Sequence, residues 1–161
     1  MKVSRQLVWV PLLLLGSFVP AFGQVEKVAI RTTGISCGTC AAFSEIYLRR
    51  LAGVDRIKIS LSNEAILVSY KPGAIFQPKD LRDVLKRTDV GVLQFQISAR
   101  GRLLEQGGRR FFVAGRERFV LKTAPDTPQI PADTPVLIEA MLNDQTDPME
   151  LKVLTVTPFK R

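Results

Sequence analysis

Histidine is absent from this 161-residue chain, and cysteine occurs only twice, at Cys37 and Cys40. Catalytic arrangements that pair a serine or a cysteine with a histidine are therefore excluded. A zinc site is disfavoured, because zinc usually needs about four ligands, supplied mainly by histidine and cysteine. The acidic residues show no paired spacing suited to acid–base catalysis. We expect a protein that is not an enzyme, and any thiol or soft-metal chemistry must involve Cys37 and Cys40.

Long apolar runs are also scarce, and the one near the N-terminus has the features of a secretory signal. It comprises Lys2 and Arg5, the apolar run Leu7 to Val19, and the small-residue site Ala21-Phe22-Gly23. The run is interrupted by Pro11 and is shorter than the about 20 apolar residues that span a bilayer. We expect residues 1–23 to be removed, leaving a secreted or periplasmic protein with no stable membrane span.

The two cysteines lie in the stretch Gly34-Ile35-Ser36-Cys37-Gly38-Thr39-Cys40. If a helix begins between them, both sulfurs turn toward its N-terminus, where unpaired N–H groups and the helix dipole favour thiolates. Gly34, Ser36, Gly38 and Thr39 make the approach a flexible loop. An oxidising compartment would instead favour a disulfide between the cysteines. Soft-metal binding and thiol–disulfide exchange both remain open at this point.

From Gln24 to Ala99 the hydrophobic periodicity alternates between that of strands and that of helices. The pattern predicts strands at 25–32, 54–61, 65–70 and 91–99 and helices at 38–51 and 79–87. Gly53 ends the first helix, Ser62-Asn63-Glu64 forms a hairpin turn, and Pro78 suits the first turn of the second helix. The order is βαββαβ, an α+β ferredoxin-like arrangement with two helices on one face of an antiparallel sheet.

This order, together with the cysteine loop, resembles the heavy-metal-associated domain family, which includes copper chaperones and periplasmic mercury-binding proteins. The resemblance covers about residues 26–97. Besides the cysteine loop, it is carried by Leu48, Leu51, Gly53-Val54, Asn63-Glu64-Ala65, Tyr70, Pro78 and Leu81. A lone Cys-x-x-Cys is weak evidence, but the same pair in the first loop of a βαββαβ pattern is a specific signal.

The resemblance implies that Cys37 and Cys40 bind one Cu(I) or Hg(II) per chain in a nearly linear two-sulfur site. The loop residues Gly34, Ile35, Ser36, Gly38 and Thr39 would support it, with Ile35 as a buried plug where the family usually has methionine. Ser36 stands where zinc-handling relatives carry aspartate. The implied partner is a thiol-bearing metal donor or acceptor protein, such as a metal-transporting ATPase. Thiolates select soft metals, which agrees with this ligand set.

One face of the first predicted helix carries apolar residues that point away from its buried stripe. Phe43, Ile46 and Tyr47 fall at these angles, whereas Ser44 takes an apolar position on the buried face. Scattered surface hydrophobes are common. The alternative hypothesis is that Phe43, Ile46 and Tyr47 form a docking face for the second domain or for a partner.

The tail, residues 100–161, does not share the family resemblance. Strand-like runs occur at 102–105, 110–114, 118–122, 136–142 and 150–156. Five short strands without a helix predict a small all-β barrel or sandwich, OB-like or SH3-like. The proline-rich segment 123–135 predicts a long connection across it. The expected domains are therefore 24–99 and 100–161, joined stiffly if the strands at 91–99 and 102–105 are continuous.

The tail is rich in arginine, and the whole chain has a formal net charge of +8. Arginines interleaved with phenylalanines can bind single-stranded nucleic acid; here they are Arg100, Arg102, Arg109, Arg110, Arg116 and Arg118, with Phe95, Phe111, Phe112 and Phe119. Export argues against nucleic acid as a partner, so a solvated basic edge is expected, with an anionic lipid, a glycan or an acidic protein partner as the alternative. The leading prediction is an exported protein that captures and transfers Cu(I) or Hg(II). The alternatives are a thiol–disulfide redox protein and a non-metal adaptor that uses the tail.

Overall fold

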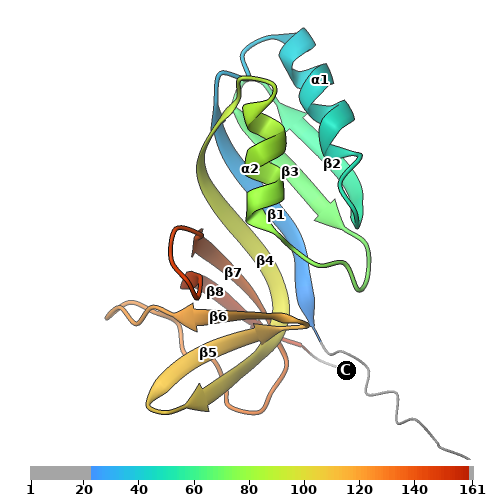
Figure 1. Cartoon of the computed structure of the whole chain (residues 1–161). Helices are drawn as coiled ribbons and strands as arrows, with labels where there is room; N and C mark the ends of the chain where they lie inside the picture. Colours follow the sequence, from blue (N-terminus) through green and yellow to red (C-terminus); the bar gives the residue numbers. More distant parts are fainter. Residues whose placement is uncertain (1–22, 160–161) are drawn as a thin grey trace, which may run out of the picture.

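The computed structural model describes residues 23–159. Residues 1–22 of the predicted signal segment 1–23 lie outside this range. The first part follows the predicted order, with β1 (Gln24–Thr33), α1 (Gly38–Leu48), β2 (Val54–Ser60), β3 (Ala65–Tyr70) and α2 (Pro78–Lys86). The helix α1 ends at Leu48 rather than at the predicted Leu51. Both helices cover the same face of the strands β2, β3, β1 and β4 (Figure 1), which confirms the predicted layers.

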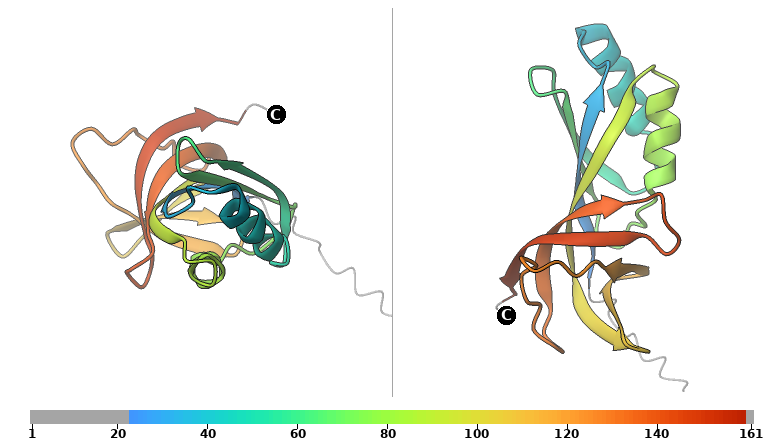
Figure 2. Two further views of the ribbon diagram at one scale, coloured as in Figure 1. Left: turned by 90° about the horizontal axis from the view of Figure 1, so that it is seen from above. Right: turned by 90° about the vertical axis from the view of Figure 1, so that its left-hand side faces the viewer.

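The strand β4 (Gly91–Gln106) is the longest element and belongs to both parts of the chain. Residues 91–100 pair with β1, and residues 102–106 pair with β5 (Arg109–Ala114). The two predicted strands at 91–99 and 102–105 are therefore one continuous strand, and the expected boundary at residue 99 falls within it. Figure 2 shows β4 running from the helix-covered sheet into the part of the molecule formed by residues 100–159, which we call the β-rich part.

The remaining strands are β6 (Glu117–Leu121), β7 (Val136–Asn143) and β8 (Glu150–Pro158). Each strand pairs with the next in the order β4, β5, β6, β8, β7, and β7 pairs again with β4. Only β6 and β8 are parallel among these pairs. The five strands therefore close into a ring rather than forming two separate sheets.

One hydrophobic cluster fills both parts of the molecule. It joins Ile30 and Leu81 under the helices to Phe112, Phe119 and Ile138 inside the ring. The continuity follows from β4, whose inward residues lie under the helices and then pair with inward residues of β7, as Ile97 does with Ala140. The two parts therefore share a core as well as a strand.

Several side chains link the two parts at their junction. A buried Glu117 carboxylate on β6 accepts a hydrogen bond of 2.6 Å from the Phe76 N–H, which precedes α2. Glu26 forms an ion pair with Arg100 at 2.6 Å.

Within residues 23–159, no helix is long and apolar enough to cross a membrane.

Candidate metal centre

The loop between β1 and α1 lies at the end of the molecule remote from β5 and β6 (Figures 1 and 2). Gly34 begins the loop with a φ of +84°, and a Cβ there would lie 3.0 Å from the Asp89 carbonyl oxygen. Both the left-handed backbone and the close approach favour glycine. Ile35 is fully buried, as expected for the apolar residue under the loop. Ser36, Gly38 and Thr39 are exposed, so the loop opens to solvent.

Cys37 and Cys40 stand at the start of α1, as the sequence predicts. Cys37 is the N-cap residue, and its Sγ accepts a hydrogen bond of 3.0 Å from the Cys40 backbone N–H. Cys37 is exposed, whereas Cys40 in the first helical turn is partly covered. The backbone N–H therefore favours negative charge on the Cys37 sulfur once the thiolate forms.

The two sulfurs are joined by a disulfide, with the Cα atoms 5.3 Å apart. The sequence left this state open as the competitor of metal binding. A disulfide has no thiolate to offer a metal, so this is the oxidised form of the site. Two electrons and two protons from an external dithiol, which itself becomes a disulfide, would convert it to the dithiol.

The reduced pair would supply two sulfur ligands. Among the described residues, no group of three or more His, Cys, Asp and Glu side chains is placed to hold a metal. Two thiolates without further ligands suit soft cations that accept low coordination numbers. The donor set therefore fits a soft cation and does not fit the four-ligand geometry that zinc prefers.

Two hydrogen-bonded hydroxyl groups connect α1, the helix that carries Cys40, to the residues that follow α2. Ser44, which is fully buried on α1, lies 2.9 Å from the Thr88 hydroxyl, and Thr88 donates in turn to the Leu85 carbonyl oxygen. The polar residue at an apolar helix position is thereby satisfied. The sequence flagged Ser44 as unusual but did not indicate its partner, which is 44 positions away.

The outer face of α1 is open to solvent. Phe43 is 54% exposed and Ile46 is 48% exposed, while Tyr47 is partly buried with the Arg50 guanidinium 5.3 Å from its ring centre. The hypothesis that this face docks on the second domain is therefore wrong, because the β-rich part lies at the other end of the molecule (Figure 1). Docking on a partner remains a prediction.

Two of the tail arginines lie against aromatic rings of the chain itself. The Arg118 guanidinium lies 3.7 Å from the Phe111 ring centre, and that of Arg100 lies 4.1 Å from the Phe159 ring centre. Phe112 and Phe119 are fully buried inside the ring of strands. Phe111, Phe112 and Phe119 are thus buried by the protein's own packing, whereas Phe159 remains 43% exposed.

Comparison with known proteins finds sequence similarity over part of the chain. Over 60 residues the chain is 46% identical to copper-transporting ATPase 2 of Mus musculus and 45% identical to the proteins of that name from Rattus norvegicus and Homo sapiens. The N-terminal part of the chain resembles the heavy-metal-associated domain family in sequence and in its order of strands and helices. The match covers 37% of this chain but only 4% of the mouse ATPase, so the chain spans a small fraction of its relatives' length.

Solved structures show a weaker likeness to the heavy-metal-associated domain. A CopZ metallochaperone aligns over 42% of this chain and 98% of its own, with 22% identity and a TM-score of 0.39. The yeast copper transporter domain Ccc2a aligns over 42% of this chain and 94% of its own, with 23% identity and a TM-score of 0.36. No protein-family profile matches the chain. The family assignment rests on the sequence identity and on the order of strands and helices.

Proposed function

We propose that the reduced Cys37–Cys40 pair binds copper(I) and exchanges it with the thiolates of a partner protein. The observation that carries this proposal is the placement of the pair. Both cysteines lie at the exposed start of α1, in a heavy-metal-associated domain whose sequence relatives are copper-transporting ATPases. Copper is preferred over mercury because the relatives are named for copper; Hg(II) suits the same ligands and is an outcome of the test.

Binding begins from the dithiol. An external dithiol first reduces the disulfide and becomes a disulfide itself, and each cysteine then loses a proton when its sulfur bonds to the cation. The Cys40 N–H that points at Cys37 Sγ stabilises negative charge on that sulfur. The complex of two thiolates with copper(I) retains one negative charge.

The unequal exposure of the two cysteines suggests an order of transfer. Cys37 is exposed at the loop and meets an incoming complex first, whereas Cys40 is held in the first turn of α1 and completes the pair. Exchange with a partner passes through complexes in which three sulfurs share the metal. A Cys37→Ala protein that accepts metal as fast as the unmodified protein would reverse this order.

The partner is a thiol-bearing donor or acceptor, and a metal-transporting ATPase has the required chemistry. The exposed residues Phe43 and Ile46 lie on the helix that begins at the cysteines, which supports them as part of the contact surface.

Residues 1–23 would act as a signal that directs the protein out of the cytoplasm. The proposed metal transfer is an exchange of ligands, so it requires no catalytic group of this chain. Mature protein that retains residues 1–23 in its own cells would contradict the export proposal.

Thiol–disulfide exchange is the second candidate, and the disulfide itself favours it. In that role the Cys37–Cys40 bond would accept two electrons from a substrate dithiol, which becomes a disulfide. The adaptor alternative rests on the ring of strands β4 to β8. Five strands in one closed ring support a small barrel, OB-like or SH3-like, over a sandwich.

The test is a competition titration under anaerobic conditions with the disulfide reduced. Copper(I) supplied as a complex with a chromophoric chelator should transfer one equivalent to the protein. Zn(II) should not compete, and parallel titration with Hg(II) measures its relative affinity. The Cys37→Ser/Cys40→Ser variant should take up none. Equal uptake by that variant would contradict the proposal. In a separate assay of the disulfide form, rapid oxidation of substrate dithiols by a protein that does not bind copper stably once reduced would support the redox candidate.

A further inference from the structure

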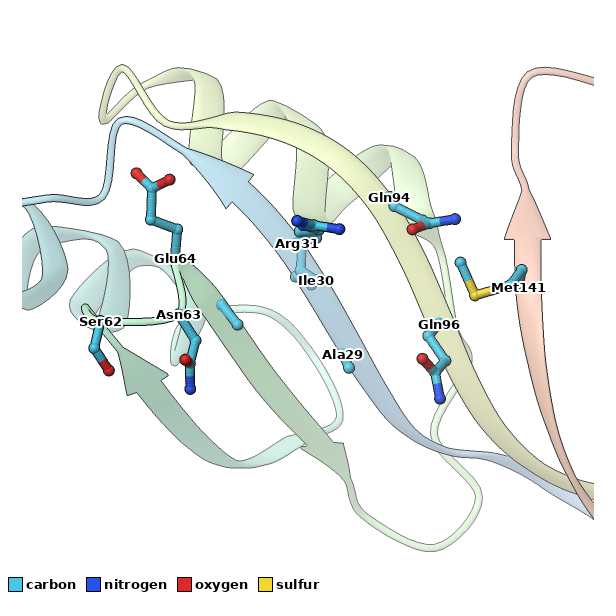
Figure 3. Close-up of a pocket in the computed structure, with 10 residues that line it drawn as sticks. Ala29, Ile30, Arg31, Ser62, Asn63, Glu64, Gln94, Gln96 and Met141 are labelled. Atoms are coloured by element: carbon cyan, nitrogen blue, oxygen red, sulfur yellow. The ribbon is translucent and has the colours of Figure 1, made fainter. Parts of the chain in front are cut away.

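The sheet face opposite the helices continues across the junction between the two parts. Strand β4 pairs with β1 on one edge and with β7 on the other, through residues 95–101. Because β8 then pairs with β7, six strands present one uncovered face in the order β2, β3, β1, β4, β7, β8. Figure 3 views this face with the helices behind the sheet.

One row of residues crosses all six strands in register. The paired positions are Lys58, Leu67, Ala29, Gln96, Met141 and Lys152. Paired residues of neighbouring strands lie on the same face of a sheet. Five strand spacings of about 4.8 Å separate the two terminal lysines, which gives a row about 24 Å long. The row is therefore cationic at both ends and mainly apolar or amide in the middle.

The middle of this face is hollow. A depression of about 590 Å³ is lined by β1, β4 and the β2–β3 turn, with Met141 of β7 also in its lining. In Figure 3 the side chains of Gln94, Gln96 and Met141 gather at one side, while Asn63 and Glu64 stand at the other. Ala29 lies between these two groups of side chains, and its small side chain leaves the depression open there. The surface is thus concave and offers both apolar contact and amide hydrogen bonding.

The charge and composition of the face narrow the ligand class. Cations outnumber acids on it; the cations are Lys27, Arg31, Arg56, Lys58, Arg100 and Lys152, and the acids are Glu26, Glu64, Glu139 and Glu150. None of the residues that the register places on this face within the described strands is aromatic, and Phe159, just beyond β8, already lies against the Arg100 guanidinium. Proteins that hold bases without sequence preference stack successive bases on aromatic side chains, so a nucleic acid fits this face poorly. A polypeptide needs charge pairing, amide hydrogen bonds and apolar contact, which this face supplies.

We propose that this six-stranded face binds an acidic polypeptide segment that has apolar residues between its carboxylates. The segment lies across the strands, with its acids against Lys58 and Lys152 and its apolar residues over Leu67, Ala29 and Met141. Arg31 adds a central cation beside the row. This surface lies opposite the helices and contains neither cysteine, so it is independent of the metal site. It requires β7 and β8, which lie outside residues 26–97, the part that resembles the heavy-metal-associated family.

The test uses the reduced full-length chain and a fluorescein-labelled peptide, Glu-Glu-Ser-Val-Ser-Val-Glu-Glu, whose extended length is about 26 Å. Fluorescence anisotropy should show binding that weakens with added salt, because the contacts are largely ionic and exposed. The same peptide with glutamine at every glutamate position should bind at least tenfold more weakly. Amide NMR shifts on peptide addition should map to Ala29, Gln96 and Met141.

Matched variants locate the surface. Lys58→Glu/Lys152→Glu should weaken peptide binding at least tenfold, whereas Lys86→Glu/Arg116→Glu, with the same change in charge at exposed positions off the face, should leave it within twofold. Circular dichroism and copper uptake check that both variants fold. The Cys37→Ser/Cys40→Ser variant should bind the peptide as tightly as the unmodified protein. The peptide-binding proposal can therefore be tested even if the protein does not bind copper.

Three outcomes overturn the proposal. The first is a failure of the acidic peptide to bind at low salt. The second is equal weakening by the control pair, which would place binding on scattered surface charge. The third is binding of twelve-residue oligothymidine or phosphatidylserine vesicles to the same face in preference to the peptide, which would assign a different ligand.

Discussion

Arg82 on α2 and Asp144 in the β7–β8 connection form a two-point ion pair, with Nε 2.5 Å from Oδ2 and Nη2 2.8 Å from Oδ1. The same guanidinium lies 4.9 Å from the Phe95 ring centre on β4. Only 7% of the Asp144 side chain is exposed. The pair joins residues 62 positions apart and holds the helix layer against the ring of strands.

The first prediction concerns the stability that this pair contributes. Asp144→Asn should lower the free energy of unfolding at pH 7 by about 1–3 kcal/mol, because hydrogen bonds to charged groups are worth roughly that much. Hydrogen bonds from Arg82 hold the pKa of Asp144 below its ordinary value of 3.8. The contribution is therefore complete above that value and is lost as the pH falls through the lowered pKa.

Urea unfolding of the unmodified protein and of Asp144→Asn, at pH 7 and near pH 2, measures the contribution of the ion pair to the free energy of unfolding. The difference between them should shrink at the lower pH. Asp83→Asn, which removes an exposed pair with Lys79 on the same helix, is the control and should change stability little. A difference for Asp144→Asn that persists at low pH would show that its charge is not the cause.

The second prediction concerns the buried carboxylate of Glu117. Glu117→Ala leaves the Phe76 N–H without its acceptor and should cost about 1–3 kcal/mol, whereas Glu117→Gln keeps an acceptor oxygen and should cost less. Hydrogen exchange of the Phe76 amide should accelerate in the alanine variant only. Equal exchange in the two variants would mean that another group satisfies this N–H.

Local pattern predicted most elements of this fold, and the reasons are visible in particular residues. The alternation of Val28 and Ile30 predicted β1, and Pro78 with Leu81 and Leu85 predicted α2 to within a residue at each end. The strands of the tail were also placed correctly within a few residues. Each of these signals depends on neighbours in the sequence, where periodicity and turn residues act.

Contacts between distant residues were not predictable from the same patterns. The pairing of Gln96 with Met141, which closes the ring and extends the open face, joins two ordinary strands with no local sign of partnership. The acceptors Asp144 and Glu117 looked like dispersed surface acids. At the cysteine site, spacing and context predicted the helix start, but the oxidation state depends on an external reductant and so has no sequence signal.

The third prediction concerns the loop at Gly34. Gly34→Ala should destabilise the domain by about 1–2 kcal/mol, because an alanine at a φ of +84° is strained and its Cβ approaches the Asp89 carbonyl oxygen. Copper affinity should fall with it. Gly38→Ala is the matched control, since a Cβ there meets nothing within 4 Å. Thermal unfolding and copper competition measure both variants, and equal effects would remove the special role of Gly34.

The fourth prediction concerns the exposed face of α1. Ile46→Lys should leave stability within about 0.5 kcal/mol, as is usual for surface substitutions. It should slow copper transfer to a thiol-bearing acceptor protein severalfold if this face forms the contact. Leu154→Lys on β8, at a residue that is also exposed, is the control. Stopped-flow transfer rates that are the same for Ile46→Lys and the unmodified protein would eliminate the docking face.

The most direct test of the metal-site account is native mass spectrometry of the protein isolated from its own cells under anaerobic, thiol-protecting conditions. The account predicts a chain that carries one copper ion, lost in the Cys37→Ser/Cys40→Ser variant. A bare chain lighter by two hydrogens, which stays bare after reduction and exposure to copper(I), would contradict it and assign Cys37 and Cys40 to redox or structural roles.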